Sequence, residues 1–187
     1  MTLYSFSFLC LFLPVVLTGY YAGWNIPRAK LWLLAASLGF YASLDARHLP
    51  LLLLSLAVND GVSRQILGSP AGSLARQRWF KAGLAFNVGL LLLCKYTGFF
   101  FGRPLLHSFP LGISFFTLQE IAFLVDVYQG LIPKVESLDH ALSVAFFPRV
   151  SSGPILDYRD TLRDLSRPDL LQSDARNLAT GLRHLLS

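Results

Sequence analysis

The sequence is poor in charged side chains. Of its 187 residues, 14% are charged and 53% are hydrophobic, whereas a soluble domain carries about 25% charged residues. The mean hydropathy is +0.51. The net charge of +5 does not indicate nucleic-acid binding, because the basic residues lie between apolar segments and form no patch with interleaved aromatic side chains. The composition therefore predicts an integral membrane protein.

Cysteine is scarce, and a secretory signal is missing. Cys10 and Cys94 both lie in apolar segments, which gives no support for a disulfide framework or a CxxC metal site and predicts two small buried side chains. Met1 to Pro27 holds no charged side chain, so it lacks the positively charged start and the small-residue cleavage site of a signal peptide. Leu3 to Ala22 is therefore predicted to be a retained first membrane segment.

The common catalytic motifs are also missing. The chain has no GxSxG nucleophile elbow, no glycine-rich phosphate loop and no HExxH metal site, so no metal is expected. The histidines fit none of these arrangements and are interpreted as loop or surface residues: His48, His107, His140 and His184.

Apolar segments dominate the chain up to residue 156. A helix that crosses a bilayer needs roughly 20 apolar residues, and Leu3–Ala22 and Ala82–Gly102 meet this length. Leu31–Leu44 and Leu49–Val58 have only 14 and 10 residues. They form either a re-entrant or broken hairpin buried in protein or short helices in a locally thinned bilayer.

The remaining apolar segments complete the predicted fold. Pro110–Tyr128 is one further segment, and Leu138–Val150 is another, shorter one. Lys95, inside Ala82–Gly102, must reach the interface or find a partner. The prediction is an all-α, multi-pass transmembrane protein with short and broken helices.

The Lys and Arg residues predict the orientation. With the N-terminus outside, the shorter inner loops hold six basic residues and the outer loops hold two, as the positive-inside rule requires. The six are Arg28, Lys30, Arg64, Arg76, Arg78 and Lys81, and the two are Arg47 and Arg103.

The chain changes character at residue 157. Asp157–Ser187 contains five Asp and five Arg, so residues 1–156 are interpreted as membrane-embedded and 157–187 as a water-facing, cytoplasmic segment. The last predicted helix begins at Ser173, a plausible N-cap, and no stop signal precedes Ser187. We therefore expect the sequence to be truncated at this end.

Three polar residues interrupt the apolar stretch Pro110–Gly130. Ionisable residues inside a membrane segment are candidate functional residues, and here Gln119, Glu120 and Asp126 are the candidates. Glu120 and Asp126 lie about 120° apart on a helix and form no facing acid–base pair. Gln119 and Asp126 share a face, which is predicted to be a packing stripe together with Gly112, Phe115 and Ala122.

A structural role is the alternative for both carboxylates. Asp126 then pairs with Lys95 or an Arg, or lies at the interface near Tyr128. For Glu120 the functional and structural interpretations both stay open.

A second unusual stretch, FFPRVSSGPILDYRD, runs from Phe146 to Asp160. Pro148 and Gly153-Pro154 break any helix here. The break either exposes backbone groups that line a site or a channel, or it forms an ordinary helix end and turn.

Together these two stretches resemble the membrane-bound O-acyltransferases, in particular the bacterial alginate O-acetyltransferase type. The first matches the family's P-x-G-I-S-F motif and, except at Gln129 where an Arg is usual, its D-V-Y-R-G motif. The second matches F-P-x-x-x-x-G-P-I followed by an aromatic residue, Arg and Asp. Weaker matches extend the similarity over nearly all of the chain. The matching residues are Pro110, Gly112, Ile113, Ser114, Phe115, Asp126, Val127, Tyr128, Gly130, Phe147, Pro148, Gly153, Pro154, Ile155, Tyr158, Arg159 and Asp160.

The resemblance implies a funnel-shaped helical fold crossed by a tunnel, of which this chain is the N-terminal part. It implies a bacterial inner-membrane enzyme without a bound cofactor. Acetyl-CoA or a similar thioester would donate an acetyl group from the cytoplasm. An exported polysaccharide such as alginate, or another cell-wall polymer, would accept it through a periplasmic or surface acyltransferase- or esterase-like partner.

The resemblance also implies that the catalytic histidine of the family is not in this chain, because it stands in a W-H context in the second half of the longer family members. The chain alone would then be inactive. The alternative is a non-enzymatic multi-pass protein, such as a transporter or an assembly subunit, that uses Glu120 and Asp126 for ion or substrate passage.

Overall fold

The computed structural model describes residues 8–22, 25–101, 112–147 and 158, and every regular element in these ranges is helical. The all-α prediction is therefore confirmed for this part of the chain. The elements are a π-helical turn η1 (Phe8–Phe12), followed by α1 (Leu13–Tyr20), α2 (Ile26–Asp45), α3 (Leu49–Gly68), α4 (Leu74–Phe101), α5 (Ile113–Gln129) and α6 (Ser137–Ala145).

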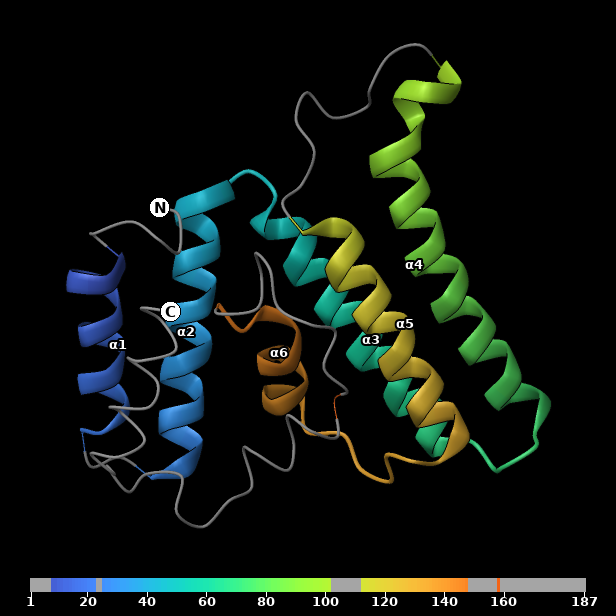
Figure 1. Cartoon of the computed structure of the whole chain (residues 1–187). Coiled ribbons are helices and arrows are strands. Elements are labelled where there is room, and N and C mark those ends of the chain that lie inside the picture. The colour runs from blue at the N-terminus through green and yellow to red at the C-terminus, as the bar shows by residue number, and fades with distance from the viewer. Residues whose placement is uncertain (1–7, 23–24, 102–111, 148–157, 159–187) are drawn as a thin grey trace, which may run out of the picture.

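The helices form a row (Figure 1). α1 and α2 lie at one end and α4 at the other, α3 and α5 pack beside α4, and the short α6 lies between α2 and the α3–α5 pair. Consecutive long helices run in opposite directions. The start of α2, the end of α3 and the start of α4 therefore lie on the same side of the row.

α2 and α3 are longer than the apolar segments that predicted them. Each has 20 residues, because Arg28 and Lys30 at one end and Asn59 and Asp60 at the other continue the helices. The expectation of two short segments was wrong. The turn between them was predicted correctly, and each helix has a proline in its first turn, where the missing N–H costs nothing.

α4 also begins before its apolar segment, eight residues ahead of Ala82.

α5 lies between two glycines. Gly112, at the N-cap, has φ 71°, and Gly130, at the C-cap, has φ 79°. Side chains with a Cβ rarely adopt this left-handed conformation, which is the physical reason for glycine at both motif positions.

Three apolar clusters make up the core. One joins α2, α3, α5 and α6 through residues that include Tyr41, Leu56 and Phe116. The second joins α3 and α5 through Val62, Ile66 and Leu124, among others. The third packs η1, α1 and α2 around a group of aromatic rings: Phe8, Phe12, Phe40 and Phe147.

Among the described residues, no helix is both long and apolar enough to cross a membrane. The multi-pass arrangement stays a prediction. Cys10 is exposed, contrary to the expectation that both cysteines are buried. The predicted helix near Ser187 lies outside the described residues, as does the rest of the water-facing segment apart from Tyr158.

Candidate functional site

Polar side chains from five helices meet in the interior and form what we call the buried polar layer. At most 9% of any of these residues is exposed. The layer consists of Lys30, Asn59, Asn87, Gln119, Glu120, Asp139, His140 and Ser143. Burial of a polar group destabilises the fold unless the group is hydrogen-bonded. The hydrogen-bond and ion-pair partners of these side chains therefore determine the role of the layer.

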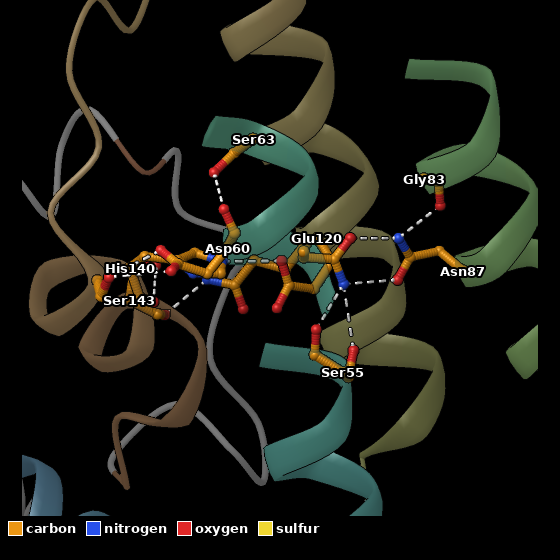
Figure 2. Close-up of polar contacts among 11 residues, drawn as sticks. Ser55, Asp60, Ser63, Gly83, Asn87, Glu120, His140 and Ser143 are labelled. Carbon is orange, nitrogen blue, oxygen red and sulfur yellow. Dashed lines mark hydrogen bonds and ion pairs between the residues drawn. The ribbon is translucent and has the colours of Figure 1, made fainter. Parts of the chain in front are cut away.

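The centre of the layer is an ion pair between α5 and α6 (Figure 2). Glu120 Oε2 lies 2.9 Å from His140 Nε2, and the two side chains are 0% and 1% exposed. The ring of Phe123, one turn after Glu120, stacks on the imidazole with centroids 4.2 Å apart. A carboxylate that holds an imidazole in this way fixes the orientation of the ring.

Gln119 adds a second link between the same two helices. Its Nε2 donates a hydrogen bond of 2.7 Å to the Ser143 carbonyl. Within the described ranges, Gln119 Oε1 and Glu120 Oε1 are buried without a hydrogen-bond partner. Neighbouring positions of α5 therefore both face α6.

A buried ion pair joins α6 to α2. Lys30 Nζ lies 2.7 Å from Asp139 Oδ1. Asp139 and His140 are consecutive and point about 100° apart on a helix, so α6 is attached to α2 on one side and to α5 on the other.

α3 and α4 meet through two buried amides (Figure 2). Asn59 Nδ2 donates to Asn87 Oδ1 at 3.2 Å, and Asn87 Nδ2 donates to Asn59 Oδ1 at 2.7 Å. Each amide also donates to the carbonyl four residues earlier in its own helix, Ser55 for Asn59 and Gly83 for Asn87. This reciprocal pair fixes the register of the two helices.

At the outer edge of the layer, polar contacts are more exposed. Ser137 Oγ donates to the Asp60 carboxylate at 3.0 Å, and Arg64 Nε lies 3.0 Å from the same group. A hydrogen bond from the Lys134 ammonium, 3.0 Å away, lowers the pKa of the exposed Glu136 carboxyl.

Arg76, at the start of α4, caps the C-terminal end of α5. Its guanidinium donates to the carbonyls of Val127 and Tyr128 at 3.2 and 3.0 Å, where the helix leaves its last carbonyls without partners. The Phe80 ring stacks on Tyr128 with centroids 4.3 Å apart. The motif residue Tyr128 is thus positioned by α4.

Tyr158 is 4% exposed. Its ring meets that of Phe123 edge-on, with centroids 5.0 Å apart. Burial raises the pKa of Tyr158 to about 12, and the charge of Asp139 adds to this effect. The phenol is therefore neutral over the whole physiological range.

Comparison with known proteins identifies the family. No protein-family model matches the chain, and no solved structure matches it. The peptidoglycan O-acetyltransferase of Helicobacter pylori is 35% identical over 94% of the chain. The probable alginate O-acetylase AlgI of Pseudomonas aeruginosa is 34% identical over 82% of it, and that of Azotobacter vinelandii 33% over 82%. The chain belongs to the membrane-bound O-acyltransferase family.

The chain matches only part of each relative. It spans 40% of the Helicobacter protein, 32% of the Pseudomonas protein and 34% of the Azotobacter protein. A teichoic acid D-alanyltransferase of Lacticaseibacillus rhamnosus is 30% identical over 48% of the chain.

The candidate residues fall into two environments. Gln119 and Glu120 are buried in the polar layer, whereas Asp126 is only partly buried near the end of α5. The predicted packing stripe is wrong at Ala122, which is exposed. The buried face of α5 instead includes Phe116, Glu120, Phe123 and Val127, so Glu120 lies within the packing face and not apart from it.

The predicted pairing of Asp126 with Lys95 is also wrong. Phe80 stacks on Tyr128, and Lys95 follows Phe80 by 15 residues of the same helix, or about 22 Å. Lys95 instead lies over the ring of its neighbour Tyr96, 5.8 Å from the centroid.

His140 is not the loop or surface residue that the sequence predicted, because it is part of the polar layer within α6. His48 lies in a loop as predicted, in the turn between α2 and α3, where it is buried with Nδ1 2.8 Å from the Asp45 carboxylate. The rule that nominated Glu120, an ionisable residue in an apolar segment, applies equally to His140 in Leu138–Val150 and could have found it. His107 and His184 lie outside the described residues.

The family-motif residues are described only in part. Gly112 and Gly130 begin and end α5, Ser114 is partly buried in its first turn, and Tyr128 packs on α4. Outside the described residues lie Pro110, Pro148, Gly153, Pro154, Arg159 and Asp160. In the described part of the chain, no three His, Cys, Asp or Glu residues are placed to hold a metal ion.

Proposed function

We propose that the chain is the N-terminal part of a membrane-bound O-acetyltransferase that modifies a polysaccharide or another cell-wall polymer. One observation carries this proposal: the chain is 35% identical, over 94% of its length, to a protein named peptidoglycan O-acetyltransferase. The similarity to alginate O-acetylases over 82% of the chain supports the same reaction class.

In this proposal acetyl-CoA or a similar thioester supplies the acetyl group from the cytoplasm. An exported polymer accepts it outside, through a periplasmic or surface partner of the acyltransferase or esterase-like kind. The general base, a histidine in a W-H context, belongs to a part of the enzyme beyond this chain. The buried polar layer holds the helices of a tunnel wall together, since Glu120 and His140 are both shielded from solvent.

The distribution of side chains supports a location in the bacterial inner membrane. The ionisable and amide side chains of the buried polar layer lie inside, while large aliphatic side chains are exposed, among them Leu31, Leu53, Leu54, Leu92, Leu93 and Leu118. Inward-facing polar residues and outward-facing apolar ones are typical of a helical protein surrounded by lipid.

The proposed orientation has the N-terminus outside. Arg28 and Lys30 lie near the start of α2, Arg64 near the end of α3, and Arg76, Arg78 and Lys81 near the start of α4, all on one side of the row (Figure 1). Arg47 is on the other side, in the α2–α3 turn. A reporter fused between Ser69 and Ser73 should be cytoplasmic, and an external signal would contradict this orientation.

Transfer of labelled acetyl groups tests the enzymatic proposal. The protein encoded by the complete gene, in membranes with its neighbouring gene products, should move label from acetyl-CoA to alginate or to peptidoglycan. The purified 187-residue chain should transfer none, because the general-base step lies elsewhere. Turnover by the isolated chain would overturn the assignment of the base.

A stop codon after Ser187 in an expressed gene, with no neighbouring acyltransferase half, would favour the non-enzymatic interpretation.

A further inference from the structure

We propose that the start of α4 binds the headgroup of an anionic phospholipid, with the phosphate between Arg78 and Lys81. This inference rests on the proposed membrane location and not on acetyl transfer. α4 carries four basic residues and no acidic one over its 28 residues. The helix is therefore positively charged along its length, and its first turns hold three of those four charges.

Two of these charges are available to a ligand. Arg76 is engaged with the end of α5. Arg78 and Lys81, by contrast, are exposed, and within the described part of the chain their side chains make no ion pair or hydrogen bond. Residues three apart on a helix have Cβ atoms about 5–6 Å apart. Both side chains can thus reach a single phosphate, the guanidinium through two parallel donors and the ammonium as a point charge.

An exposed aromatic side chain lies at the same level. Trp79 is 41% exposed and directly follows Arg78, from which its side chain is turned by about 100° around the helix. Tryptophan is enriched at membrane–water interfaces, where the apolar ring contacts the upper acyl chains and the indole N–H remains among polar groups. Its level along the helix, within one turn of Arg78 and Lys81, favours a membrane surface over a soluble anion such as free phosphate.

An apolar face continues directly from this cluster. Ala82, Ala85, Val88 and Leu92 are spaced at three and four residues and are all exposed on the outer side of α4, which lies at the end of the row of helices (Figure 1). The next charge is Lys95, 14 residues after Lys81, or about 21 Å along the axis. Basic side chains that extend outward at both ends bring this length close to the roughly 30 Å of a hydrocarbon core.

The basic residues and the apolar face of α4 can thus bind the headgroup and an acyl chain of a single phospholipid molecule. The phosphate lies at Arg78 and Lys81 and an acyl chain lies along Ala82 to Leu92, while Trp79 marks the level of the membrane interface on another face of the helix. A juxtamembrane basic residue strengthens binding to an anionic membrane surface about fivefold. Loss of two such residues should therefore weaken binding by about thirtyfold.

Lipid binding to the full chain tests the proposal. The purified chain in mild detergent is titrated with phosphatidylglycerol and with phosphatidylcholine of identical acyl chains, and bound lipid is counted by native mass spectrometry. We expect tighter binding of the anionic lipid. R78Q/K81Q should remove most of this preference. R47Q/K95Q, which removes two exposed basic residues on the opposite side of the row, should retain it.

Each outcome of this titration supports or contradicts the proposed headgroup site. Equal loss in both double variants, or an equal affinity of the parent chain for the two lipids, would overturn the headgroup site while leaving the membrane location intact. Binding of neither lipid would count against the membrane location as well. If R78Q/K81Q does not fold, the parent chain and W79F are compared in vesicles of brominated phosphatidylglycerol. Bromine near the headgroup end of the chains should then quench Trp79 more than bromine at their far end, and the reverse order would overturn the proposal.

Discussion

His140 Nε2 lies 2.9 Å from Glu120 Oε2, and neither side chain reaches the surface. The pair joins α6, a helix of nine residues, to the centre of α5. Isolated helices of this length are unstable, so α6 depends on its tertiary contacts. The two consecutive residues Asp139 and His140 provide two of these contacts, each as part of a buried ion pair.

Removal of one member of the central pair should destabilise the protein more than removal of both. H140L leaves the Glu120 carboxylate buried without its partner, a change that typically costs about 3–5 kcal/mol. The double variant E120L/H140L should recover much of this loss, because an apolar pair can replace a buried ion pair. The thermal midpoint of the purified chain, followed by tryptophan fluorescence, measures the difference.

The conservative variant E120Q provides the control for that cycle, since its amide oxygen can still accept from His140. It should lose less stability than E120A.

In the full-length enzyme, E120A and D126A should lower folding yield more than they alter the choice of acyl donor. Normal yield with lost activity would instead make Glu120 or Asp126 a residue of the active site.

The amide pair between α3 and α4 should behave as one unit. N59L or N87L leaves the other amide with one partner fewer in the interior, which typically costs about 1–3 kcal/mol. The double variant should cost less than the sum of the two single variants, because the second substitution removes a group that has already lost its partner. Additive costs in a double-mutant cycle would show that the two amides act independently.

Gly83 and Gly89, both in α4, should respond to alanine in opposite ways. A Cβ at position 83 would lie 2.6 Å from Leu124 Cδ1 and 2.9 Å from Val62 Cγ1, whereas at position 89 it would meet nothing within 4 Å. G83A should therefore lose about 1–3 kcal/mol of unfolding free energy through overpacking. G89A should gain up to about 1 kcal/mol because alanine favours the helix. Equal effects on the unfolding midpoint would contradict the close approach of α3 and α5 at Gly83.

Tyr158 should titrate at a higher pH than a solvent-exposed tyrosine. Its pKa is raised from 10.0 to about 12, so the folded state favours the protonated phenol. The contribution of this shift to stability is complete below pH 10 and is lost as pH rises through about 12. The absorbance of phenolate, compared between the parent chain and Y158F, should show a missing component centred near 12. A missing component centred near 10 would contradict the burial of this side chain.

Helix type and the positions of turns could be predicted from the sequence, whereas helix ends could not. The break at Asp45–Pro50 was evident from a charged cluster and a proline. Asn59, Asp60, Arg28 and Lys30 were expected to end helices, because hydropathy alone treats a polar residue as a boundary. In the structure Lys30, Asn59 and Asp60 have polar partners on neighbouring helices, and Arg28 is exposed in the first turn of α2, so α2 and α3 continue through these residues.

Only part of the candidate site could be predicted from the sequence, because its residues lie on different helices. Gln119 and Glu120 were nominated because they interrupt an apolar segment, and both are buried. Their partners His140 and Ser143 were missed, since they follow by 20 and 24 residues and nothing in local spacing connects α5 to α6. Helical spacing also placed Glu120 outside the packing stripe of α5 and Ala122 inside it, whereas in the structure Glu120 is buried against His140 and Ala122 is exposed.

The sequence by itself determined the all-helical class, the family and the glycines that begin and end α5, because these depend on composition, on motifs and on local backbone conformation. Only the tertiary structure decided which polar residues pair, since each pair joins helices far apart along the chain. It also decided that the free charges of α4 face outward, next to an apolar surface. Burial and partnership arise when helices pack against one another, and a single helix considered alone contains neither.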